Sequence, residues 1–194
     1  MPVVLGPPDR SARGEIQSLT ARIIGIGGYF AGDDAVGLAV VRHLGTRIDR
    51  PHQLELLETT DPGRLVDLLA TDCLVVLIDA VAVDAEQPDV QAGSVTVFSE
   101  TDVTREMHFL SSHTITVPQA IQLARTLDPE NTTARIVFVG IAIDVPVVVG
   151  GDLSPVIAAA VPVASDVVLQ LVERYPSPAC TGSPAGHTAN LLSP

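Results

Sequence analysis

The sequence of 194 residues contains no tryptophan, and aromatic residues make up only 3% of it. Basic residues are also scarce: 11 Lys and Arg stand against 23 Asp and Glu, a formal net charge of −12. Because binding to nucleic acid or to an anionic membrane surface needs a basic face, we expect neither as a partner. With so few aromatics, a core must be built from Val, Ile, Leu and Ala, which favours a buried parallel sheet covered by helices.

Cysteine is rare as well. Cys73 and Cys180 belong to no CxxC pair, so we expect no disulfide framework and treat Cys73 as a small core residue. The first fifteen residues lack the basic and then apolar segments of a signal peptide. The apolar stretches are interrupted, for example by Pro162 and Asp166, so we expect no membrane span. These absences favour a cytoplasmic protein, and nothing in the sequence indicates an oligomeric state.

The chain divides into one central region and two flanking segments. Residues 1–20 are expected to form a flexible extension, and residues 176–194, which have four prolines and no charged residue, a disordered tail. Over residues 21–175, apolar runs alternate with helical patterns, which predicts a single α/β domain. We expect a three-layer sandwich in which helices cover both faces of a twisted, mostly parallel sheet of about five strands.

Individual elements are placed by their apolar periodicity and by turn residues. The last helix is expected to start at Pro155 with Ser154 as its cap, and Pro162 should kink or split it. The expected strands cover residues 23–26, 54–57, 74–78, 94–98 (near an edge) and 135–141, and the other expected helices cover residues 34–48, about 64–70 and 115–127.

Three segments carry side chains that could perform chemistry. Residues 22–44 combine a buried strand, a glycine-rich turn, the adjacent carboxylates Asp33 and Asp34, and an amphipathic helix. Helix capping needs one such aspartate but not two. Asp79 directly follows a central apolar run, at the edge where open α/β sheets bind ligands, and His113 precedes a predicted helix. Asp34, Asp79 and His113 together could hold a borderline divalent metal with open positions.

Other classes of site fit less well. The sequence has no HExxH, no GxSxG elbow and no P-loop, which excludes zincins, α/β-hydrolases and P-loop nucleotide enzymes. Residues 25–30 begin like a dinucleotide-binding GxGxxG, and Glu58 ends the second strand like a ribose-binding acid. However, Phe30 stands where close packing needs a small residue, and the two aspartates would face the pyrophosphate. A nucleotide-binding oxidoreductase is therefore the weaker alternative.

The pattern resembles the hydrogenase maturation endopeptidases, which process the large subunit of [NiFe] hydrogenases. The GxGN-like turn and the D[DE]xxG element of that family match residues 25–28 and 33–37 here. An acid after the central strand matches Asp79, and a histidine before a helix matches His113. The resemblance covers about residues 22–173, and the ordered set of matches is more specific than any one of them.

The resemblance implies both a function and a site. The substrate would be the nickel-loaded precursor of the large subunit, and the enzyme would remove its C-terminal extension. Asp34, Asp79 and His113 would face the nickel, with Asp33 and Glu58 supporting them. Metal-assisted and aspartic-type hydrolysis both stay open. Because Gly28 replaces the usual asparagine and ETTDPG replaces a DGGT-like turn, a chaperone that checks nickel without cutting is the alternative from a different class.

Overall fold

A computed structural model gives the arrangement of most of the predicted domain. The residues that it describes are 19–28, 32–48, 53–83, 90–106, 115–132, 134–144 and 150–176. The expected extension up to residue 18 and the expected tail from residue 177 lie outside these ranges.

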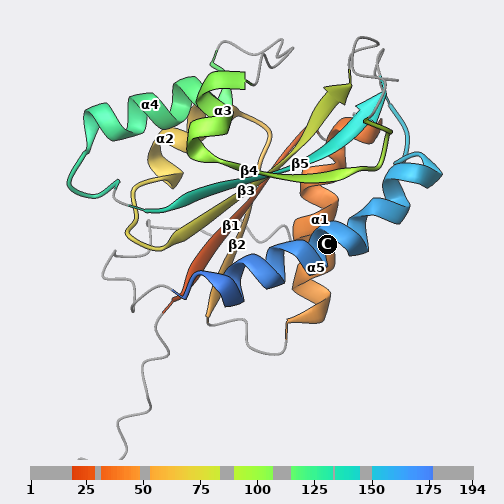
Figure 1. The fold of residues 1–194 in the computed structure, drawn as a ribbon, viewed down its shortest axis with the longest axis horizontal. Coiled ribbons are helices and arrows are strands. Elements are labelled where there is room, and N and C mark those ends of the chain that lie inside the picture. Colours follow the sequence, from red (N-terminus) through yellow and green to blue (C-terminus); the bar gives the residue numbers. More distant parts are fainter. Residues whose placement is uncertain are drawn as a thin grey trace, which may run out of the picture.

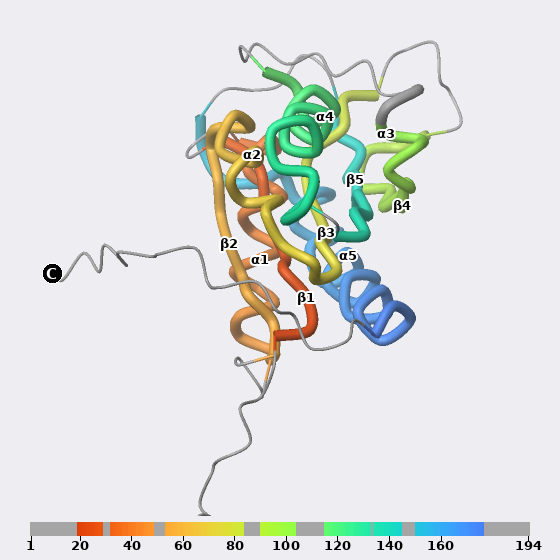
Figure 2. Tube along the Cα trace, turned by 90° about the vertical axis from the view of Figure 1, so that its left-hand side faces the viewer, coloured from red at the N-terminus to blue at the C-terminus, as the bar shows by residue number. Residues whose placement is uncertain are grey.

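The strands form one five-stranded sheet with the order β2-β1-β3-β5-β4, so that β2 lies at one side and β4 at the other (Figure 2). Neighbouring strands are parallel except for β4, which pairs antiparallel with β5 at the edge. This confirms the predicted α/β class, the mostly parallel sheet and the edge position of the fourth strand. The strands are β1 (Ala21–Ile26), β2 (Leu54–Thr59), β3 (Leu74–Val83), β4 (Val95–Ser99) and β5 (Ile136–Asp144).

Helices cover both faces of the sheet, α1 and α5 on one face and α2, α3 and α4 on the other (Figure 1). Each face has its own apolar core, so the central strands are buried on both sides and contain almost continuous apolar runs. The α-helices are α1 (Val36–Arg47), α2 (Leu65–Leu68), α3 (Glu100–Glu106), α4 (Val117–Leu127) and α5 (Pro155–Arg174), and the 3-10 turns are η2 (Gly32–Ala35) and η3 (Pro62–Arg64).

Two elements differ from the expectation. β3 runs five residues beyond its predicted end at residue 78, because residues 80–83 continue to pair with β5 as far as Asp144. α3 was not predicted at all. It starts where the backbone N–H of Ser99 bonds the Asp102 carboxylate and the N–H of Asp102 bonds the Ser99 hydroxyl. That reciprocal capping pattern is visible in the sequence and indicates the start of a helix.

The last helix, α5, starts at Pro155 as predicted and runs unbroken through Pro162 to Arg174, so the predicted split is wrong. By length and composition alone, α5 is apolar enough to cross a membrane. A helix in the core of a water-soluble domain passes the same test, and the buried side chains of α5, such as Ile157 and Val168, pack against α1 and the sheet.

Cys73 lies directly before β3 and is fully buried, as expected of a small core residue. It also takes part in a disulfide bond, which the sequence did not lead us to expect. The other cysteine of the chain, Cys180, lies outside the described residues.

Glycines bring α1 into direct contact with the sheet. A Cβ atom at Gly25 would collide with the carbonyl group of Gly37, and a Cβ atom at Gly37 would collide with the carbonyl oxygens of Ile26 and Ile78. The first turn of α1 therefore rests on the end of β1 and on β3. This explains the glycine that closes the D[DE]xxG element, and it brings η2, the turn just before α1, next to β3.

Replacing Gly37 by alanine is expected to lower the free energy of unfolding by about 2 kcal/mol or more, because the new methyl group would overlap backbone oxygens that cannot move independently. Gly45 in the same helix is the matched control, since only Leu56 Cδ1, at 3.6 Å, would lie near its Cβ. Gly45→Ala should therefore be neutral or stabilising by up to about 1 kcal/mol. Urea unfolding measures both values, and equal losses would contradict the close packing at Gly37.

Candidate functional site

Asp34 lies in η2, just beyond the carboxyl end of β1. Its Oδ2 accepts a hydrogen bond from the backbone N–H of Gly28 at 3.2 Å. Gly27 has a φ of 153°, and a side chain there would collide with the carbonyl group of Asp34. The glycine-rich turn thus wraps closely around Asp34 and holds its partly exposed carboxylate at the end of β1.

Asp79 lies within β3, at the point where β1 ends. Its neighbour Ile78 pairs with Gly25 of β1, whereas Asp79 itself pairs with Gly140 of β5. One carboxylate oxygen accepts a hydrogen bond from the N–H of Ala80 at 2.8 Å. β3 continues to Val83, so Asp79 does not end its strand as predicted; it lies inside β3, level with the carboxyl end of β1.

The two carboxylates interact electrostatically. The pKa of Asp79 is raised from 3.8 to about 8: burial is the largest cause, repulsion from the charge of Asp34 adds to it, and the hydrogen bond from Ala80 opposes it. Although Asp79 is partly exposed as a residue, its carboxyl group is buried, and the loss of solvent around that group is the main cause. A carboxyl group that keeps its proton at neutral pH beside a second carboxylate can exchange protons with a substrate, or exchange its proton for a cation.

His113, the third predicted member of the site, lies outside the described residues. Among the residues that are described, no group of three or more His, Cys, Asp and Glu could hold a metal ion. The helix predicted to follow His113 is present as α4, and it starts with a capping box between Thr116 and Gln119. The structure thus brings Asp34 and Asp79 together and leaves the position of His113 a prediction.

The two acids expected to support the site have specific partners. Neither aspartate of the pair caps α1, whose N-cap residue is Ala35 without a side-chain bond. Instead, Oδ1 of Asp33 accepts a hydrogen bond from the backbone N–H of Ser154, at 2.6 Å. Glu58 forms a bidentate ion pair with Arg42 on α1, with N–O distances of 2.9 and 2.7 Å. Neither partner was evident from the sequence, because both lie far along the chain.

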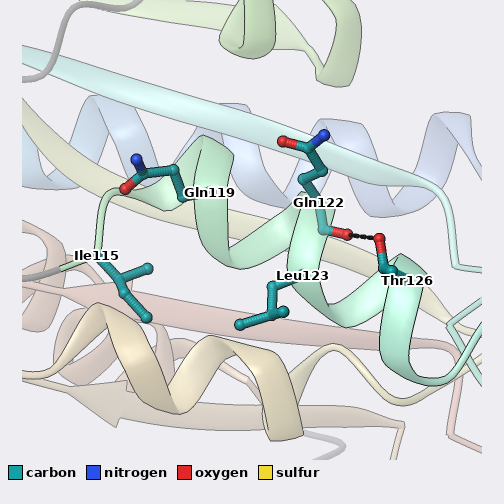
Figure 3. A pocket seen from close by; sticks show the side chains of 5 residues that line it. All are labelled: Ile115, Gln119, Gln122, Leu123 and Thr126. Carbon is teal, nitrogen blue, oxygen red and sulfur yellow. Dashed lines mark hydrogen bonds between the residues drawn. The ribbon is translucent and has the colours of Figure 1, made fainter.

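A cavity of about 400 Å³ lies along α4 (Figure 3). The aliphatic side chains project to one side of the helix and the two amides to the other. No side chain of this described lining is ionisable, so the cavity offers no acid–base chemistry of its own and the carboxylate pair remains the candidate site. The lining residues are Ile115, Gln119, Gln122, Leu123 and Thr126.

Comparisons with known proteins agree with this fold. The family model described as hydrogenase maturation protease (HycI) matches residues 38–171, a region that includes Asp79 and begins four residues after Asp34. The chain is similar to the structure of the [NiFe] hydrogenase maturation protease HybD from Thermococcus kodakarensis, with 25% identity and a TM-score of 0.61 over 79% of this chain and 99% of that one. The hydrogenase maturating endopeptidase HybD from E. coli is 19% identical, with a TM-score of 0.63 over 80% and 93%. Among curated proteins, no match is found.

Proposed function

The chain belongs to the hydrogenase maturation protease family, and on this premise we propose that it is an endopeptidase that removes the C-terminal extension from the precursor of a [NiFe]-hydrogenase large subunit. The observation that carries the proposal is the interacting pair Asp34 and Asp79, which lies where β1 ends beside β3. In this proposal the precursor carries nickel, and Asp34, Asp79 and His113 face that ion.

The side chains fit a divalent cation that arrives with the substrate. Repulsion between Asp34 and Asp79 contributes to the raised pKa of Asp79, and a cation held by both carboxylates would relieve that repulsion and displace the proton. Two carboxylates with an imidazole suit a borderline metal with open positions. Bound there, nickel would polarise the scissile carbonyl group or lower the pKa of a water molecule.

The protein supplies the proton transfers of peptide hydrolysis. Asp34, as a carboxylate, takes a proton from the water whose oxygen bonds to the scissile carbonyl carbon. When the C–N bond breaks, the leaving nitrogen gains a proton, and the products are a shortened large subunit with a new carboxylate and a released peptide with a new amino group. In the metal-assisted route the cation would have displaced the proton of Asp79, so Asp34 would return to the leaving nitrogen the proton that it took from the water.

The raised pKa of Asp79 favours a second mechanism for the same function. With its proton retained at neutral pH, Asp79 would donate it to the leaving nitrogen while Asp34 acts as the base, as in an aspartic-type pair. Nickel would then only position the precursor. The two mechanisms differ in what they need: the first requires the metal for cleavage, and the second does not.

Incubation with nickel-loaded and nickel-free precursor, followed by mass spectrometry, tests the proposal. We expect a shortened large subunit and a released C-terminal peptide from the nickel-loaded precursor alone. Equal cleavage of both precursors would support the aspartic-type pair. Stable binding of the loaded precursor without a shortened product would overturn the protease assignment in favour of a nickel-checking chaperone.

A further inference from the structure

The N-terminus of α5 lies against the carboxylate of Asp33, a residue that the proposed chemistry does not use. Oδ1 of Asp33 accepts a hydrogen bond from the backbone N–H of Ser154 at 2.6 Å, across 121 residues of sequence. Ser154 directly precedes α5, which begins at Pro155 and is 20 residues long. This bond therefore joins η2, the turn that carries Asp34, to the start of a long helix.

Asp33 supplies a side-chain hydrogen-bond acceptor at the start of α5. The first N–H groups of a helix have no partner inside it and carry a partial positive charge. The side chain of Ser154 does not cap α5, and its Oγ is buried without a hydrogen-bond partner among the described residues. A carboxylate from another element accepts the N–H of this N-cap residue, at a distance typical of a strong, charge-assisted hydrogen bond.

Within the described part of the chain, two other contacts of η2 are local. Asp34 accepts its bond from the N–H of Gly28, and Gly27 packs beneath the carbonyl group of Asp34. Both contacts come from the segment that directly precedes η2, so they would move together with it. Asp33 adds a contact to an element that is distant in sequence.

The element that receives this contact is firmly fixed. Ser165 of α5 bonds to Nδ1 of His43 on α1 at 2.8 Å, and Asp166 forms an ion pair with Arg47 on α1 at 2.7 Å. The inner face of α5 is buried in the core that it shares with α1 and the sheet, and Figure 1 shows α5 beside α1 on one face of the sheet. A bond to the N-terminus of α5 therefore fixes η2 relative to the whole sheet, including β3.

We propose that Asp33 is a positioning residue: by holding the N–H of Ser154, it fixes η2 and thereby places the carboxylate of Asp34 beside Asp79. The inference rests on the proposed role of Asp34 in hydrolysis. Asp33 and Asp34 are adjacent in a single tight turn, so a shift of one moves the other. Side chains that hold reacting groups in place need such support from rigid elements.

Three variants test this role. Asp33→Ala removes the acceptor, and Asp33→Asn keeps an Oδ1 that can accept the same N–H. Asp166→Ala removes the ion pair between α5 and Arg47 of α1 and leaves η2 unchanged. In Asp33→Ala we expect kcat for precursor cleavage to fall about 10-fold to 100-fold, the range seen when residues that hold reacting groups are removed. The KM should stay within about twofold, because Asp33 does not touch the substrate in this scheme. Asp33→Asn should recover most of the loss, and Asp166→Ala should keep the wild-type kcat.

Hydrogen exchange provides a second measurement that does not depend on activity. Exchange of the peptide covering residues 32–38 should accelerate in Asp33→Ala, but not in Asp33→Asn or Asp166→Ala. A wild-type kcat in Asp33→Ala, or an equal loss in Asp166→Ala, would overturn the positioning role. If the wild-type protein cleaved no precursor, the proposed function would fail. Unchanged exchange in Asp33→Ala would separately overturn the claim that the hydrogen bond of Asp33 fixes η2 to α5.

Discussion

Replacing Asp79 by asparagine is expected to reduce precursor cleavage by at least about 1,000-fold while leaving the fold intact, and Asp34→Asn should have a similar effect. An acid or base placed at the reacting atoms contributes about 10²–10⁴-fold, and loss of a cation ligand adds to this. Asparagine keeps the size of each side chain, so packing around β3 and η2 is retained. Mass spectrometry of the precursor over time measures the rate.

A matched control separates this effect from a general loss of charge. Asp144 is exposed and is the last residue of β5, the strand in which Gly140 pairs with Asp79. It lies four residues beyond Gly140, which at about 3.3 Å per residue is a distance of about 13 Å. Asp144→Asn should keep activity within about threefold, as expected of a surface change outside the site. Full activity in Asp79→Asn would remove this residue from the mechanism, whichever of the two mechanisms holds.

The second large effect concerns stability in the absence of metal. The pKa of Asp79 is about 8 in the folded protein, against an ordinary value of 3.8. Between these values the folded form keeps a proton that the unfolded chain loses, so the free energy of unfolding falls as pH rises from about 4 to about 8. At about 1.4 kcal/mol for each pKa unit, this single group costs several kcal/mol at pH 8.

Asp79→Asn should therefore be more stable than the wild type at pH 8 in chelator-treated samples, and the difference should vanish near pH 4. Asp34→Asn should recover a smaller part of the free energy of unfolding that is lost at pH 8, because repulsion from Asp34 is a lesser cause of the raised pKa of Asp79 than burial. Urea unfolding at several pH values measures each free energy. If Asp79→Asn were less stable than the wild type at pH 8, the carboxyl group would not carry the expected cost. Stability given up for a functional group is common at active sites.

The sequence was most informative where local pattern and sheet topology act together. The strand, glycine turn and acid pair around Asp34 occupy the predicted place, and Asp79 lies on the neighbouring strand of the sheet. Parallel strands end at one edge, so residues after different strands can be expected to meet without any knowledge of their contacts. The glycines at positions 25 and 37 have a clear structural purpose, which is the close approach of α1 to β1 and β3.

Contacts between distant segments were not accessible in this way. The bond from Ser154 to Asp33 joins residues 121 positions apart, and no local rule relates them. In the sequence, a charged residue that interrupts the apolar run predicts the end of the strand at Asp79. Pairing with β5 continues past it, since the apolar residues after Asp79 still find a partner strand there. Pro162 predicts a kink or a split in the last helix, but α5 runs through it without a break and packs against α1 and the sheet.

The third member of the site needs evidence of another kind, because His113 lies outside the described residues. Crystals soaked in a nickel salt would locate the ion through its anomalous scattering. We predict one dominant peak that is coordinated by Asp34, Asp79 and His113 together. A dominant peak that lacks either aspartate, or that lies away from the carboxyl end of β1, would contradict the assignment of this site.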